Sequence, residues 1–160
     1  MGKRVLASGV FDILHPGHIK YLNSAKRLAG RGGKLIVVVA RDDTVIRTKG
    51  KSPVFDERER AFIVSSLKPV DEVVLGHLCP DLGEAFMKTV SKVRPDIVAL
   101  GYDQARWAEL VKRAARNTGR EVRLVKIRKF SSGGAVPPSS SRIKRRIART
   151  EWDELNRKRK

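Results

Sequence analysis

Two patterns of apolar and polar positions alternate along the chain. Residues 34–40 (KLIVVVA) form a nearly continuous β-branched run, which is typical of a strand buried on both faces. Residues 16–29 place apolar side chains at helical spacing and are followed by a helix-ending stretch, GRGG. The same patterns predict further strands at 3–9, 70–76, 95–101 and 120–127, and further helices at 82–93, 103–119 and 141–158.

The segment between the second and third strands is interpreted as a polar loop containing Pro53, followed by a helix with an acidic start. Strands and helices alternate throughout, which predicts an α/β fold: a parallel sheet with helices on both faces and right-handed crossovers. The 160 residues suffice for one domain, 1–160, with a basic C-terminal helix and tail at about 139–160. Ligands of such a fold bind beyond the carboxyl ends of the strands. The segments SGVFDILHPGH and ALGYDQ, at the ends of the first and fourth strands, therefore matter most.

The net charge of +18 is the outlying feature of the composition. Residues 120–160 hold 14 Lys and Arg but only 4 Asp and Glu, a balance that favours polyanionic partners. One alternative is therefore a nucleic-acid-binding protein that retained the fold. Aromatic residues make up only 6% of the chain and are not interleaved with the basic run, so base stacking is poorly supported and nucleic acid is not the expected partner.

Other classes are excluded by what the chain lacks. The longest apolar run, 35–40, is far shorter than the roughly 20 residues of a membrane span, so we expect a cytoplasmic protein with no membrane partner. The single cysteine, Cys79, excludes an internal disulfide. His77 stands two residues before it, but no second half of a metal site is found, and a plain, partly buried thiol is the preferred interpretation. We assign no metal ligands.

The junction after the first strand carries the strongest chemical signal. Pro16 suits the first position of a helix, and Gly17 lets an anion approach the backbone. Free N–H groups at a helix start favour phosphate. His15 and His18, three residues apart, can point to the same side of the helix and complete a phosphate cradle. The alternatives are a helix cap with a half-buried histidine, or metal ligation by both.

Three segments resemble the cytidylyltransferase-like nucleotidyltransferase superfamily, which carries an HxGH signature. GVFDILHPGHIKYLNSAK is similar to its first strand-loop-helix, RTKGKSPVFDERERAFIVSSLKPVDEVVLG to its second block and SSSRIKRRI to a variant of its closing motif. The resemblance covers nearly the whole chain. It implies a Rossmann-like, doubly wound sheet of about five strands in the order 3-2-1-4-5. It also implies transfer of a nucleoside monophosphate from a triphosphate to a phosphate monoester, with release of pyrophosphate.

The resemblance assigns roles to individual positions. The backbone at Val10 and Phe11 would contact nucleotide phosphates, and His15 and His18 would stabilise charge on the bridging and α-phosphate oxygens. The loop lysine would be Lys49 or Lys51, and Lys51 is preferred because it is nearer the PVFDERER block. The remaining assignments are Arg60 as a phosphate contact or a structural ion pair, Asp103 as a nucleoside contact, and Ser139 and Ser140 as caps of the last helix and phosphate donors.

Within the superfamily, DIVALGYDQ resembles the archaeal FAD synthases, which adenylylate FMN with ATP. RTKGKSPV is equally similar to glycerol-3-phosphate cytidylyltransferases, the alternative, but their GDD and RTEGISTT segments are absent. The stretch SSGGAVPPSSS lacks the paired cysteines typical of archaeal FAD synthases. The expected partners are ATP and FMN, with Mg²⁺ or another divalent cation carried mainly by the triphosphate. A homodimer is a candidate assembly; Trp107 and Trp152 are candidate interface residues, although a core position is preferred for both.

Overall fold

All five strands of the structure, a computed structural model, join one parallel sheet. The structure describes residues 2–117, 119, 121–130 and 139–158. Most of the loop predicted before the last helix, the side chain of Trp152 and the last two residues lie outside this description. The order is β3-β2-β1-β4-β5, as predicted. The strands are β1 (Arg4–Gly9), β2 (Lys34–Val39), β3 (Glu72–Leu75), β4 (Ile97–Leu100) and β5 (Arg123–Lys126).

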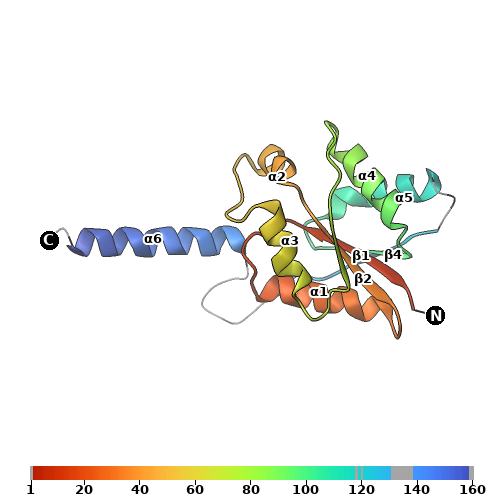
Figure 1. The fold of residues 1–160 in the computed structure, drawn as a ribbon, viewed down its shortest axis with the longest axis horizontal. Helices are drawn as coiled ribbons and strands as arrows, with labels where there is room; N and C mark the ends of the chain where they lie inside the picture. The colour runs from red at the N-terminus through yellow and green to blue at the C-terminus, as the bar shows by residue number, and fades with distance from the viewer. Residues whose placement is uncertain (1, 118, 120, 131–138, 159–160) are drawn as a thin grey trace.

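Helices cover both faces of the sheet (Figure 1). Successive residues of a strand point to opposite faces, so β2 sends Leu35 and Val37 into one core and Ile36 and Val38 into the other. The first core is shared with α1 (Pro16–Ala29) and α3 (Glu57–Ser65). The second is shared with α4 (Leu82–Val93) and α5 (Ala108–Asn117), which follows the short 3₁₀ helix η1 (Ala105–Trp107). The predicted two-faced α/β architecture is confirmed.

One helix was not predicted. The stretch interpreted as a polar loop contains α2 (Asp42–Lys49), so that interpretation was wrong. Val45 is the only residue that the helix buries, and one buried position produces no apolar periodicity. Asp42 and Asp43 in the first turn complement the positive helix end, and Gly50, with φ 68°, ends the helix in a left-handed conformation.

The last helix, α6 (Ser140–Lys158), begins beside the first loop of the chain and extends away from the sheet (Figure 1). Its first turns are fixed there by two contacts. The Ser140 hydroxyl donates to the Ile13 carbonyl at 3.0 Å, and Lys144 pairs with Asp12. No helix among the described residues is both long enough and apolar enough to cross a membrane.

Candidate functional site

A cavity of about 450 Å³ lies beyond the carboxyl ends of the strands. It collects segments from both halves of the chain, as expected where the strand order of a doubly wound sheet reverses. Arg60 and Pro16 are the two predicted site residues that do not line it. The predicted residues that do line it are Val10, Phe11, His15, Gly17, His18, Lys49, Lys51, Asp103, Ser139 and Ser140.

The two histidines face each other at the start of α1. Their ring centroids lie 3.9 Å apart at an interplanar angle of 20°. His15 is also the N-cap of α1, because its Nδ1 accepts from the Gly17 N–H at 3.1 Å, and Pro16 follows at the first helical position. The capping and cavity interpretations of His15 therefore both hold. Because Nδ1 is the acceptor, the neutral ring carries its proton on Nε2, which makes Nε2 a donor.

Burial keeps both rings uncharged at neutral pH. It lowers the pKa of His15, and it lowers the pKa of His18 to about 4, with smaller effects from the charges of His15 and Lys49. The His18 Nδ1 atom is buried and has no hydrogen-bond partner in the structure. A buried polar atom in that state costs about 1–3 kcal/mol, so His18 gains from any ligand atom that pairs with it.

A strained turn connects β1 to this pair. Phe11 has φ 52°, in the left-handed region, and its ring is 1% exposed and meets the His18 ring edge-on at 5.2 Å between centroids. Gly9 makes room for that ring, because a Cβ there would lie 2.8 Å from Phe11 ring carbons. The turn places the backbone of residues 9–11 along the cavity wall.

Lys49 and Lys51 both reach the cavity from opposite sides of Gly50. The charge of Lys49 contributes to the lowered pKa of His18, which brings Lys49 into the electrostatic surroundings of the histidine pair. The preference for Lys51 stays a prediction, and Lys49 has this additional observation in its favour.

Arg60 is a fully buried cation behind the site. Its guanidinium donates to the carbonyls of Val10 at 2.6 Å and Ala40 at 2.7 Å, and it pairs with Asp42 at 2.5 Å. These bonds tie the ends of β1 and β2 together. The structural ion pair, one of the two roles considered for Arg60, is the one that these contacts describe.

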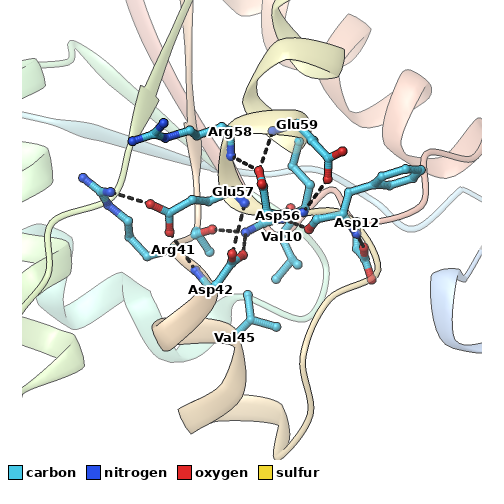
Figure 2. A network of polar contacts seen from close by, with 12 residues as sticks. Val10, Asp12, Arg41, Asp42, Val45, Asp56, Glu57, Arg58 and Glu59 are labelled. Atoms are coloured by element: carbon cyan, nitrogen blue, oxygen red, sulfur yellow. Dashed lines mark hydrogen bonds and ion pairs between the residues drawn. The ribbon is translucent and has the colours of Figure 1, made fainter.

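Acidic residues at the starts of α2 and α3 cap the two helices (Figure 2). The Glu57 carboxylate accepts from the Asp42 N–H at 3.0 Å, and the Asp42 carboxylate accepts from the Glu57 N–H at 3.2 Å. Arg41 pairs with Glu57 at 2.5 Å. Asp56 caps α3 in a capping box with Glu59. This network fixes the chain on both sides of the loop that carries Lys51.

Sequence reasoning missed Asp12, which is 6% exposed. Its carboxylate accepts from the N–H groups of Val54 at 2.7 Å and Phe55 at 3.1 Å and pairs with Lys144. Burial would raise the pKa of Asp12, but these bonds outweigh it and hold the pKa below its usual value. Asp12 thus joins the first loop, the loop after α2 and the start of α6 around the cavity.

Two further residues that the sequence did not reveal connect β1 and β4. The Tyr21 hydroxyl donates to the Ala99 carbonyl at 2.8 Å and accepts from the Ser8 N–H at 3.3 Å. Gln104 donates to the Ser8 carbonyl at 2.9 Å and accepts from the Gly101 N–H at 2.8 Å. Burial raises the pKa of Tyr21, so the phenol stays protonated. Asp103 stands beside them, exposed at the cavity wall.

His77 and Cys79 are not part of a metal-binding cluster: among the described residues, no group of three or more His, Cys, Asp or Glu could hold an ion. Cys79 is half-buried, and the Lys88 ammonium lies 3.7 Å from its sulfur. His77 instead contacts Thr89.

Comparison with known proteins assigns the family. A family model described as cytidylyltransferase-like matches residues 6–146. The chain belongs to this family. It is 47% identical to a protein of Korarchaeum cryptofilum named FAD synthase, over 92% of both chains. It is 48% identical to an FAD synthase of Methanopyrus kandleri, over 81% of this chain and 83% of that one.

Solved structures of other proteins share the fold. A protein of Thermoplasma volcanium described as a lipopolysaccharide core biosynthesis protein matches with a TM-score of 0.70 and 48% identity, over 82% of this chain and all of the other. A pantoate-β-alanine ligase of Francisella tularensis matches with a TM-score of 0.58 at 14% identity, covering 87% of this chain and 64% of that one, which shows the shared fold alone.

Proposed function

We propose that this chain is an FAD synthase that transfers AMP from ATP to the phosphate of FMN and releases pyrophosphate. The observation that carries the proposal is the stacked, uncharged pair of His15 and His18 at the start of α1, inside a cavity at the strand ends. The FAD synthases named above are more than 45% identical to this chain over most of its length, and they supply the substrate class.

The reaction needs positioning more than covalent chemistry. An oxygen of the FMN phosphate attacks the α-phosphorus of ATP, the bond from that phosphorus to the oxygen bridging the α- and β-phosphates breaks, and pyrophosphate leaves. The attacking phosphate is already ionised, so no general base is required. Holding the two phosphates in line can supply about 7–11 kcal/mol of the barrier.

Stabilisation of the developing negative charge lowers the reaction barrier further. In this proposal the Nε2–H of His15 and the ring of His18 donate to oxygens of the reacting phosphate, and one well-placed donor of this kind is worth about 2.7–4 kcal/mol. The N–H groups at the start of α1 and the backbone at Val10 and Phe11 hold the phosphate chain. Lys49 and Lys51 neutralise the departing pyrophosphate.

The other predicted contacts complete the substrate sites. Ser139 and Ser140 flank the phosphates from the start of α6, and Asp103 meets the nucleoside. Mg²⁺ enters bound to ATP, because the phosphate end of the cavity offers mainly imidazole, ammonium and hydroxyl groups, which suit phosphate oxygens better than a resident cation. The homodimer stays a prediction.

A four-way assay tests the proposal and its alternative. Pyrophosphate release is measured with FMN or glycerol 3-phosphate, each combined with ATP or CTP, in the presence of Mg²⁺. We expect release with FMN and ATP. Release with glycerol 3-phosphate and CTP alone would replace the proposal with the cytidylyltransferase, and no release in any combination would contradict both.

A further inference from the structure

One wall of the cavity is aromatic and lies apart from the phosphate cradle in sequence and in layer. It is formed by one face of α4 together with the end of η1. Phe86 of α4 and Trp107 of η1 pack with ring centroids 5.0 Å apart at an interplanar angle of 35°. Both are half-buried, line the cavity and pack on the second core of the sheet. The α4 residues that line the cavity, at helical spacing along one face, are Leu82, Ala85, Phe86 and Thr89.

A hydrogen-bond acceptor stands at the polar edge of this wall. Thr89 is 3% exposed, and its hydroxyl donates its only proton to the Ala85 carbonyl at 2.8 Å. It therefore acts as an acceptor toward the two His77 groups near it, the backbone N–H at 3.2 Å and the ring Nδ1 at 3.1 Å. A proton on the His77 Nδ1 satisfies this contact, and in that tautomer Nε2 is an acceptor at a residue that lines the cavity.

We propose that this wall is the subsite for the isoalloxazine ring of FMN, an inference that rests on the proposed function. The isoalloxazine ring is a flat tricycle with an apolar dimethylbenzene end and a pyrimidine end whose N3–H is a donor between two carbonyls. Trp107 and Phe86 offer aromatic surface for stacking, which typically contributes about 0.5–1.5 kcal/mol per ring pair beyond area burial. His77 Nε2 accepts from N3–H.

This wall and the histidine pair line the same cavity, and the proposal places the ring of FMN at the wall and its phosphate at the histidines. The adenosine of ATP is then assigned to a second wall of the cavity. That wall is formed by Tyr102, Asp103 and residues 127–130 at the ends of β4 and β5.

Equilibrium binding tests the subsite without turnover. FMN is titrated with protein in the absence of ATP, and ATP in the absence of FMN. We expect Trp107→Leu to raise the Kd for FMN at least tenfold, to leave the Kd for ATP within twofold and to abolish the quenching of flavin fluorescence by the indole. Trp107→Phe, which keeps an aromatic ring, should lose the quenching but keep most of the affinity. Phe62→Leu is the matched control, because Phe62 is 73% exposed on α3 and does not line the cavity.

A modified ligand tests the role of His77. FMN methylated at N3 cannot donate, so wild-type protein should bind it at least fivefold more weakly than FMN. The His77→Leu variant should bind the two ligands equally. An unchanged ratio in His77→Leu would overturn that contact.

The outcomes separate the inference from the proposed function. If wild-type protein forms FAD but Trp107→Leu binds FMN normally, or loses ATP affinity instead, the subsite assignment is overturned and the proposed function stands. If wild-type protein neither binds FMN nor forms FAD, the proposed function fails and the subsite fails with it. Far-ultraviolet circular dichroism first establishes that Trp107→Leu is folded, so that a loss of ATP affinity in this variant reports binding.

Discussion

His15 and His18 stack with their ring centroids 3.9 Å apart, an arrangement that two imidazolium cations would oppose. The lowered pKa of each ring removes that conflict at neutral pH and leaves two neutral rings with N–H donors. Neutral donors suit a site that must bind a highly charged triphosphate and then release pyrophosphate, because they hold the phosphate less tightly than fixed cations would.

Removing either ring should slow the reaction without unfolding the protein. We expect His15→Ala and His18→Ala each to lower kcat for FAD formation at least about a hundredfold, as for other lost charge-stabilising donors. Asn23→Ala is the control, because Asn23 lies on the same helix, α1, and does not line the cavity. A folded histidine variant with near-normal kcat would contradict the assigned role.

The pKa of His18 also predicts how stability depends on pH. The folded pKa of about 4 lies below the usual value of 6.5, so between these values the unfolded chain binds more protons and the free energy of unfolding falls as the pH falls. From pH 7.5 to pH 5, His18 should account for a loss of about 2 kcal/mol. Carboxyl groups with lowered pKa values, such as Asp12 and Glu57, change the free energy of unfolding mainly below pH 5.

Urea unfolding of ligand-free wild type and His18→Ala at pH 7.5 and pH 5 measures this contribution. The wild type should lose about 2 kcal/mol more than the variant between the two pH values. Equal losses would show that His18 titrates normally in the folded state.

At the scale of elements, α2 and α3 depend on each other. The Asp42 carboxylate of α2 accepts from the first turn of α3, and the Glu57 carboxylate of α3 accepts from the first turn of α2. Arg60 connects both helices to the ends of β1 and β2. Helices as short as these gain little from intrinsic propensity, so their stability comes from such contacts.

Arg60→Met tests that coupling. The variant leaves Asp42 and the carbonyls of Val10, Ala40 and Phe55 without their buried partner. We expect a loss of about 3–5 kcal/mol in the free energy of unfolding, measured by urea denaturation. Arg58→Met is the matched control on the same helix, and because Arg58 is exposed its loss should stay below about 0.5 kcal/mol. Similar losses in the two variants would contradict the role assigned to the buried cation.

The elements that the sequence predicted are those with local signals. Helix α1 has Pro16 at its first turn, apolar residues along one face and a glycine-rich end, and its predicted bounds of 16–29 are confirmed. Helix α2 has none of these except its final glycine, because it buries only Val45 and receives its cap from Glu57, fifteen residues away from Asp42. Its helical state is set by tertiary contacts.

At the scale of the whole molecule, the site residues also divide into those with a local sequence signal and those defined only by contacts between distant parts of the chain. His15 and His18 lie on one turn of one helix, so their spacing reveals them. Asp12 acts through Lys144, which is 132 positions away, and no spacing rule relates the two. The assignment of residues 1–160 to a single domain stays a prediction, as do the individual substrate contacts.

The net charge of +18 also belongs to this scale, because it attracts FMN, ATP and nucleic acids alike. Charge therefore does not choose among these partners. The cavity does, because it combines the stacked pair of His15 and His18 with the aromatic side chains of Phe86 and Trp107, a chemistry that fits small nucleotides.

The most direct test of the central claim follows the α-phosphate itself. The protein is incubated with FMN, Mg²⁺ and ATP labelled with ³²P at the α position, and the products are separated by chromatography. We expect one labelled phosphate in each FAD formed and unlabelled pyrophosphate in equal amount. Label that appears only in free AMP, with FMN unchanged, would contradict adenylyl transfer to FMN.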